Sequence, residues 1–373
     1  MQSATRTSIF QRLGVKPVVN ARGFNTIVGG NTPSARMREA IEEVERYYVD
    51  MEELLARSGE AIAQLMGAEA AYVTAGAAAA LALGAAACMA GSDHDRIAQL
   101  PDTTGMRDEI LIQRSQIYQY DRSVSIFGAK LVEVEPDQLE RSIGERTAAV
   151  LFAAHMDGVP GVVPLDQVIQ LAHAKGVPVI VDAAAQVYPL ERFLSFPKSG
   201  ADLVAYSLKY FGGPNSAGIL VGRKDLIEAV SLQGFIGFEH HTNRKGLGRG
   251  FKLDRQEIVC AVVAVEEWLE MDHDRRLAEA ERRIGLISRG IERAPGVSLE
   301  LLRRPGAAPR ALQITVDPGA AKRTAEDVVK ALRDGEPAIW VNSRPGVLLV
   351  NPEPLRTESD VELVARRLRE LLA

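Results

Sequence analysis

The chain has 373 residues, of which 46% are hydrophobic and 25% are charged, and its formal net charge is −5 at pH 7. This length allows one large domain and a smaller one. The acidic balance argues against a nucleic-acid surface, because binding to phosphates needs clustered Lys and Arg.

No segment predicts a secreted or membrane protein. Residues 1–12 are polar and lack the apolar core of a signal peptide. The alanine-rich run 75–90 is too short and too interrupted by glycine to span a bilayer. Cys88 and Cys260 lie in apolar, helical surroundings and indicate no disulfide framework. We therefore expect a cytoplasmic protein with neither a membrane partner nor a nucleic-acid partner.

The first fifty residues predict an arm followed by a helix. An extended piece at 17–19 leads into the polar segment Asn20–Gly23. Thr32 then caps a helix that runs to residue 49, because threonine is a favoured helix N-cap. A second helix covers 51–66 and ends at a glycine.

Short apolar segments next alternate with helical ones, as in βα units. The predicted strands cover 70–74, 109–113, 130–134, 147–153, 177–181, 202–206 and 218–221. Continuous apolar strands separated by helices indicate a mostly parallel sheet covered on both faces. Ligands of such sheets bind beyond the carboxyl ends of the strands. Thr74, His155 and Asp182 fall at these ends.

The C-terminal part predicts a compact α+β domain. A long glycine-punctuated loop at 234–250 precedes it, and a loop of this length usually indicates function or disorder. The predicted elements are helices at 253–271, 277–294, 324–334 and 358–372 and strands at 297–302, 311–316, 339–342 and 346–351. The expected fold class is α/β, with a large, mostly parallel sheet domain and a smaller α+β C-terminal domain. We divide it into an arm and helix at 1–50, a large domain at 51–252 and a small domain at 253–373.

One lysine, Lys209, lies between two buried strands and is followed by a glycine-rich turn. Burying an ammonium group is costly unless the group is paired or used chemically. One interpretation is a turn lysine whose head reaches water. The other is a lysine that forms a Schiff base with a carbonyl group. The stretch alone leaves both open.

A strand, a glycine turn and an alanine helix meet at Gly76, Ala77 and Ala78. Small residues at the start of a helix let its first backbone N–H groups approach an anion, and the helix dipole adds to the attraction. Tight helix packing would explain the alanines equally well. The sequence lacks G-x-G-x-x-G and G-x-x-x-x-G-K-[ST], which removes the usual dinucleotide and Walker interpretations. A phosphate site stays possible here.

These features together suit pyridoxal phosphate (PLP). An aspartate, Asp182, closes one strand, Lys209 follows the next, and the helix start at Gly76 precedes both. The lysine would hold the cofactor as a Schiff base, and the aspartate would keep its pyridine nitrogen protonated. The helix start would bind its phosphate. Ala184 is small enough to let a ring lie flat.

Four segments resemble a known family. They are Val19–Gly23, Gly67–Ala80, Val181–Ala185 and Ser207–Pro214. In these segments the chain is similar to the fold-type-I PLP-dependent enzymes, within the branch that includes bacterial selenocysteine synthase and D-glucosaminate-6-phosphate ammonia-lyase. The match extends from about residue 10 to the end of the chain.

The resemblance implies a role for each matching residue. Lys209 would be the Schiff-base lysine and general base, and Asp182 would be the pyridinium partner. The other cofactor-binding residues implied are Gly76, Ala77, Ala78, Ala184, Gln186 and Ser207. A residue within 115–120 should stack on the ring, with Gln116 and Tyr118 as candidates. Members of this fold build their sites across a dimer interface, so Thr242 and Arg244 would reach the phosphate bound by a partner copy.

Arg22, His155 and Arg344 are the candidate substrate-binding residues. A guanidinium group offers a bidentate fork for a carboxylate, although Arg344 precedes a Pro-Gly turn and could equally lie at the surface. We expect no metal. The acidic balance disfavours the tRNA-dependent activity of the family, and no pocket for a second phosphate can be identified.

We therefore expect a homodimeric or larger PLP-dependent lyase of the ammonia-lyase or dehydratase type. Its substrate would be a small amino acid, with hydroxylated amino acids and those of D configuration among the candidates. Loss of the α-proton and of a β-substituent would lead to a 2-oxo acid and ammonia. A racemase or aldolase would share the first step and need another acid, such as His155 or Tyr118. A non-catalytic PLP-binding or scaffold homologue, and a Rossmann-like protein with a structural Lys209, are the alternatives of other classes.

Overall fold

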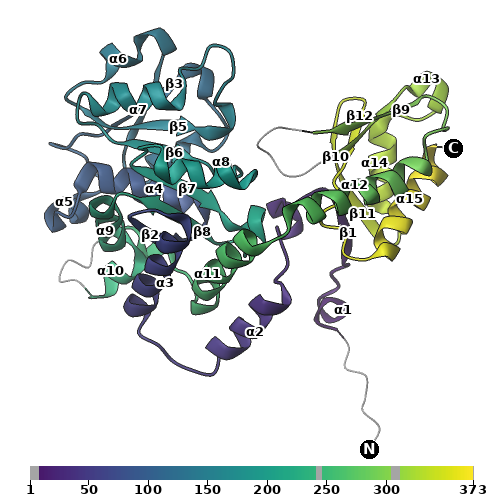
Figure 1. Ribbon diagram of the computed structural model, residues 1–373, viewed down its shortest axis with the longest axis horizontal. Coiled ribbons are helices and arrows are strands. Elements are labelled where there is room, and N and C mark those ends of the chain that lie inside the picture. The colour runs from purple at the N-terminus through teal and green to yellow at the C-terminus, as the bar shows by residue number, and fades with distance from the viewer. Residues whose placement is uncertain (1–7, 241–245, 304–310, 373) are drawn as a thin grey trace, which may run out of the picture. The chain divides into compact units, whose positions relative to one another are not determined.

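The computed structural model describes residues 8–240, 246–303 and 311–372 (Figure 1). The chain divides into two compact units, one of Asn31–Glu270 and one that combines Met1–Gly30 with Met271–Ala373. The boundaries expected at residues 50 and 252 fall inside the larger unit. The division into functional domains stays a prediction.

Helix packing explains why the larger unit extends beyond both expected boundaries. In this unit α11 (Arg255–Glu270) packs against α2 (Ala35–Val44) and against α3 (Met51–Met66). Ser34 caps α2, and Asp50 caps α3 through the N–H groups of Glu52 and Glu53. The helix expected from Thr32 to residue 49 is therefore shorter at both ends.

A seven-stranded sheet forms the centre of the larger unit. Its order is β2 (Ala70–Thr74), β8 (Gly218–Gly222), β7 (Leu203–Ser207), β6 (Val179–Asp182), β5 (Thr147–Ala153), β3 (Glu109–Gln113) and β4 (Lys130–Val134). Of these strands, β8 alone runs antiparallel to its neighbours. Every residue of β5, β6, β7 and β8 is buried. The predicted α/β fold with a mostly parallel sheet is confirmed.

The alanine run forms α4 (Gly76–Ala90), which is buried along most of its length. It packs against β5, β6, β7 and β8, and also against α9 (Lys224–Gln233). A Cβ added to Gly84 would lie 3.2 Å from Cδ1 of Leu203. The small side chains therefore let this helix approach the sheet closely.

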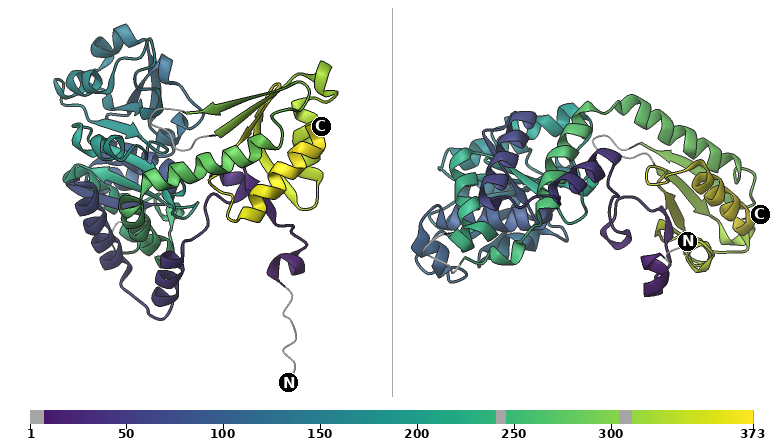
Figure 2. Two further views of the ribbon diagram at one scale, coloured as in Figure 1. Left: turned by 45° about the vertical axis from the view of Figure 1, so that its right-hand side comes forward. Right: turned by 90° about the horizontal axis from the view of Figure 1, so that it is seen from below.

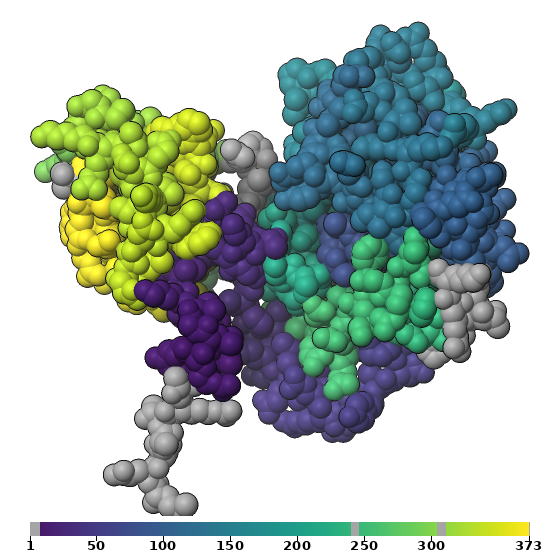
Figure 3. Space-filling model, turned by 180° about the vertical axis from the view of Figure 1, so that it is seen from behind, coloured from purple at the N-terminus to yellow at the C-terminus, as the bar shows by residue number. Residues whose placement is uncertain are grey.

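Short helices complete the larger unit. They are α5 (His94–Gln99), α6 (Leu139–Ser142), α7 (Leu165–His173), α8 (Leu190–Ser195) and α10 (Phe235–His240). The loop expected over 234–250 thus begins with a helix. A hollow of about 300 Å³ lies between α3 and the pair α9 and α10. In Figure 3 the purple surface of α3 adjoins the green surface of α9 and α10. In the described parts of the chain, no helix is long and apolar enough to cross a membrane.

The smaller unit combines a five-stranded sheet with helices. The strand order is β1 (Val18–Ala21), β11 (Ala338–Arg344), β12 (Val347–Val350), β10 (Ala311–Val316) and β9 (Val297–Leu302). Alternate residues of β10 are buried, so one face of the sheet meets the core. The helices are α1 (Ile9–Leu13), α12 (His273–Arg289), α13 (Pro318–Ala321), α14 (Ala325–Asp334) and α15 (Glu358–Leu372), and the second view of Figure 2 shows this sheet beside its helices.

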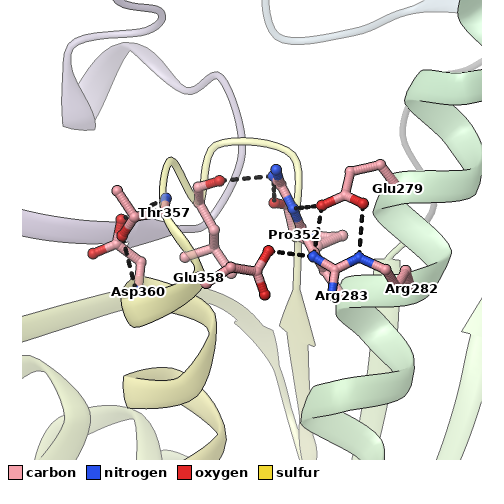
Figure 4. A network of polar contacts seen from close by, with 8 residues as sticks. Glu279, Arg282, Arg283, Pro352, Thr357, Glu358 and Asp360 are labelled. Atoms are coloured by element: carbon pink, nitrogen blue, oxygen red, sulfur yellow. Dashed lines mark hydrogen bonds and ion pairs between the residues drawn. The ribbon is translucent and has the colours of Figure 1, made fainter.

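Arginines of α12 tie this helix to the segment that leads into α15 (Figure 4). Arg283 donates through Nη1 to the carbonyl oxygens of Leu355, at 2.7 Å, and Pro352, at 3.3 Å. Arg282 pairs with Glu358, the first residue of α15. Glu279 accepts hydrogen bonds from both arginines. These contacts satisfy carbonyl groups that no strand or helix pairs.

Candidate active site

The carboxyl ends of three neighbouring strands bring the predicted residues together. Asp182 ends β6 and lies beside Ala153, the last residue of β5. His155 follows β5 directly, on a short 3₁₀ turn at Ala154–Met156. Ser207 ends β7 and pairs with Gly218, which in turn pairs with Thr74 at the end of β2. These residues therefore share the edge of the sheet at which parallel sheets bind ligands.

Asp182 is a buried carboxylate with two hydrogen-bond donors. The hydroxyl of Tyr118 donates to Oδ2, and the backbone N–H of Ala184 donates to Oδ1 at 3.0 Å. Burial raises the pKa of Asp182, while the two hydrogen bonds and the nearby ring of His155 oppose that rise. The carboxylate is therefore suited to a positively charged partner.

Asp182 opens into a cavity of about 450 Å³. The cavity is lined by Tyr118, Gln119, Tyr120, His155, Asp182, Ala184, Ala185, Gln186 and Tyr210. The rings of Tyr118 and His155 meet edge to face, with centroids 5.4 Å apart. Tyr118 and Tyr120 meet in a similar way at 6.3 Å. The wall therefore combines aromatic faces with hydroxyl and amide groups, and one carboxylate.

Lys209 lies on the short 3₁₀ turn Leu208–Phe211 that follows β7. Gly212 closes this turn with φ of 93°, and a Cβ added to Gly213 would lie 2.6 Å from Cβ of Leu208. The lysine side chain is half buried, and its Nζ is 5.1 Å from the centre of the Tyr210 ring. Burial lowers the pKa of Lys209. At neutral pH a lysine in this state has a larger neutral fraction, available for nucleophilic attack or for accepting a proton, than an exposed one.

The start of α4 offers backbone N–H groups without a capping side chain. Its N-cap residue is Ala75, and Gly76 has φ of 81°, a left-handed conformation that favours glycine. A Cβ added to Gly218 would lie 2.8 Å from the backbone N of Ala77. Thr74, Gly218 and Ser207 stand side by side across three strands at this point. The helix start and Ser207 are thus close enough in the sheet to serve one anion.

Gln116 lies apart from the cavity wall. Its side chain is fully buried, and Nε2 donates to the carbonyl oxygen of Ala153 at 3.3 Å. Gln113 contacts the same amide. Of the two candidates for stacking on the cofactor ring, Tyr118 lines the cavity, whereas Gln116 donates a hydrogen bond to the backbone of β5.

The two candidate arginines belong to the smaller unit. Arg22 follows β1, and its Nε donates to Oδ1 of Asn25 at 3.0 Å. Arg344 ends β11, which pairs with β1 in parallel, and it donates to Oε1 of Gln313. Thr242 and Arg244 lie outside the described residues. The binding roles of these four residues stay predictions.

Sequence reasoning missed Tyr210 as part of the wall, and it included Tyr120 only as the last residue of the segment 115–120, not as a candidate of its own. Tyr210 directly follows Lys209, and Tyr120 lies two residues after Tyr118 in a segment without regular secondary structure. The two-residue spacing from Tyr118 was the available signal for Tyr120. In the stretches that the structure describes, no three His, Cys, Asp or Glu side chains gather in a way that could hold a metal ion.

The donor groups fit PLP. The half-buried lysine matches an aldehyde, the buried carboxylate matches a protonated ring nitrogen, and the uncapped helix start matches a phosphate. Each group satisfies a different part of the cofactor, and all three follow strands or precede a helix at one edge of the sheet.

Comparison with known proteins places the chain among such enzymes. The aminotransferase class-V family matches residues 119–292, and the DegT/DnrJ/EryC1/StrS aminotransferase family matches residues 38–189. A 5'-C-glycyluridine monooxygenase-decarboxylase from a Streptomyces species is 33% identical and spans 100% of this chain and 94% of its own. D-glucosaminate-6-phosphate ammonia lyase from Salmonella typhimurium is 30% identical and spans 98% of each chain.

A solved structure agrees with these sequence relatives. The structure of a D-glucosaminate-6-phosphate ammonia-lyase superposes with a TM-score of 0.83, at 30% identity over 98% of both chains. The fold and the site therefore define a PLP-dependent enzyme of fold type I. Within that class, the chain belongs to the D-glucosaminate-6-phosphate ammonia-lyase-like family that its sequence motifs indicated.

Proposed function

We propose that this enzyme is a PLP-dependent ammonia-lyase acting on a small amino acid that carries a β-leaving group such as hydroxyl. The observation that carries the proposal is that Asp182 lines a cavity whose wall also includes Tyr210, on the same turn as Lys209. The relative from Salmonella typhimurium, an ammonia lyase, supports the same reaction class. A cytoplasmic location stays a prediction.

Each protein group has a separate task in this proposal. Lys209 would hold the cofactor through its ε-amino group, and Asp182 would hold the ring nitrogen. The α4 start and Ser207 would hold the phosphate, and the small side chain of Ala184 leaves room for the ring. Gln186, which lines the cavity, would donate to the cofactor's phenolic oxygen.

When bound, PLP supplies an electron sink that makes the bonds at the α-carbon of an amino acid labile. Lys209 would then remove the α-proton, because burial favours its neutral amine. His155 lines the cavity and would contact the substrate. Loss of the β-hydroxyl as water, followed by hydrolysis of the resulting enamine, would give a 2-oxo acid and ammonia.

Further residues and a second copy of the chain are proposed for the site. Arg22 and Arg344 are the proposed ligands of the substrate carboxylate, since guanidinium groups bind carboxylates in bidentate fashion. We propose a homodimer in which Thr242 and Arg244 serve the phosphate of the partner copy.

A second candidate reaction comes from the relative in Streptomyces. That protein, a monooxygenase-decarboxylase, is 33% identical along the whole chain. In the second candidate reaction, dioxygen would oxidise the amino acid at its α-carbon: the carboxylate would leave as carbon dioxide, one oxygen atom would enter the product as an amide and the other would leave as water. Orientation over the cofactor decides which bond breaks.

An absorption spectrum recorded during substrate addition tests the proposal. Purified protein with PLP should show the visible band of a lysine-bound cofactor, and the band should shift with one member of a panel of L- and D-amino acids. Release of ammonia and a 2-oxo acid in equal amounts would support the lyase. Uptake of dioxygen with release of carbon dioxide would favour the second candidate. Absence of any band after PLP addition would reject both.

A further inference from the structure

We propose that Tyr118 is a positioning residue that keeps Asp182 ionised for the cofactor. The inference rests on the proposed PLP site and deepens it, because it assigns a task to a tyrosine that touches the carboxylate. The hydroxyl of Tyr118 donates to Oδ2 of Asp182, while the backbone of Ala184 donates to Oδ1. Both oxygens of the carboxylate thus have a donor from the protein.

Tyr118 is held in place from two directions. Its backbone N–H donates to Oδ2 of Asp121 at 3.0 Å, and the N–H of Asp121 donates back to the carbonyl oxygen of Tyr118. Its ring meets the ring of His155 at 65°, with centroids 5.4 Å apart. A hydroxyl fixed in this way does not pay the full entropic cost of ordering when it binds a carboxylate.

The hydrogen bond matters because Asp182 is buried. An aspartate removed from water tends to take up a proton, and a protonated Asp182 could not pair with a charged ring nitrogen. Burial and the carboxylate raise the pKa of Tyr118, so its hydroxyl remains a donor throughout the working range. The bond therefore favours the charged form of Asp182, since a charge-assisted hydrogen bond is stronger than a neutral one.

Other ionisable groups face the same pair. His155 faces Asp182 from the turn after β5, and Tyr210 faces it from the turn that also carries Lys209. Asp121 faces Tyr118 from the far side. Among the described residues, none of these groups donates a further hydrogen bond to the Asp182 carboxylate, and Tyr118 is its side-chain donor there.

The test compares Tyr118→Phe with Tyr120→Phe. Tyr120 lines the same cavity and contacts the Tyr118 ring, but the contact with Asp182 comes from Tyr118. The dissociation constant of PLP is measured by absorbance from about pH 5 to about pH 9, a range that brackets an Asp with a raised pKa. Thermal unfolding of each cofactor-free variant checks the fold.

The sign of the effect follows from the bond. Without the hydroxyl, the pKa of Asp182 rises further, so the carboxylate becomes protonated at a higher pH. PLP affinity falls as Asp182 becomes protonated at low pH, and we call this fall the acid limb. The limb should therefore move to higher pH by about one unit, because a hydrogen bond to a charged group contributes roughly the free energy that corresponds to one pKa unit. Tyr120→Phe should leave the limb in place.

Asp182→Asn provides a second test, alone and combined with Tyr118→Phe. Asparagine does not ionise, so the part of the acid limb that comes from residue 182 should disappear, and adding Tyr118→Phe should then change nothing. An unmoved limb in Tyr118→Phe, or tighter PLP binding at every pH, would overturn the inference while the PLP site itself stands. Failure of the parent enzyme to bind PLP would instead reject the proposed function.

Discussion

Lys209 owes its chemistry to the turn that carries it. The turn Leu208–Phe211 leaves the strand, half buries the amine beside Tyr210, and closes at Gly212 in a left-handed conformation. Burial lowers the pKa of the amine, which increases the neutral fraction available for attack. A surface lysine would stay almost fully charged at neutral pH.

Replacing Lys209 by alanine should therefore abolish the visible band of the bound cofactor. Turnover should fall by at least about 10²–10⁴-fold, the usual contribution of a positioned base. The matched control is Lys224→Ala, because Lys224 is exposed on α9. Full activity in Lys209→Ala would show that the lysine is structural. Absorbance and a coupled ammonia assay measure the two effects.

The strand-end aspartate and the lysine could be singled out from the sequence because burial makes a charged residue between apolar strands unusual. Of the tyrosines in the wall, Tyr118 was a candidate from its place in the segment 115–120, whereas Tyr210 was not singled out. Tyr118 and Tyr120 reach the cavity only because the segment after β3 folds back over Asp182. Gln116, a candidate by proximity in sequence, satisfies a backbone carbonyl instead. Local spacing does not encode such loop geometry.

At the scale of elements, Asp202 connects several elements at the edge of the larger sheet opposite the candidate active site. Its buried carboxylate lies 2.7 Å from Nη1 of Arg223, 2.8 Å from Nε2 of His173, and accepts the N–H of Val179 at 2.7 Å. These partners come from α7, β6 and the end of β8. One side chain thereby connects three strands and a helix.

Asp202→Asn should lower the free energy of unfolding by about 1–3 kcal/mol, because an amide in place of the buried carboxylate cannot accept every hydrogen bond that the carboxylate accepts. Asp225→Asn is the matched control. Asp225 pairs with the same arginine but is 64% exposed, so its loss should cost at most about 1 kcal/mol. Denaturant unfolding measures both, and equal effects would contradict the importance of burial.

Gly218 is where β8 meets the start of α4. A Cβ there would lie 2.6 Å from the carbonyl carbon of Gly76 and 2.8 Å from the N of Ala77. Gly218→Ala should therefore cost about 1–3 kcal/mol of stability through overpacking and weaken PLP binding by shifting the helix start. Gly250→Ala, where a Cβ meets no atom within 4 Å, should do neither. PLP titration and unfolding curves would reveal the difference.

The strands were predictable as elements because continuous apolar runs fit a sheet buried on both faces. The pairing of the smaller sheet was not. The extended piece near residue 18 becomes β1 only by pairing with β11, which lies more than 300 residues away. No local pattern specifies such a partner, so this segment was expected to remain an arm.

At the scale of the whole molecule, the proposed dimer predicts a mass of about twice the 40.4 kDa of one chain. It also predicts complementation between two inactive variants. Mixed copies of Lys209→Ala and Arg244→Ala would form some sites with both residues intact, about one quarter after random exchange between two-fold symmetric copies. Light scattering and activity after mixing test this. A monomeric active enzyme, or no recovery, would remove Arg244 from the partner's site.

The path of the chain between the units has a consequence for biosynthesis. β1 belongs to the smaller unit, yet its partner strand, Ala338–Arg344, is synthesised after the whole of the larger unit. On the ribosome, residues 18–21 therefore have no strand to pair with while Asn31–Glu270 fold. The larger unit can mature early, whereas the smaller one closes only when nearly all of the chain has emerged.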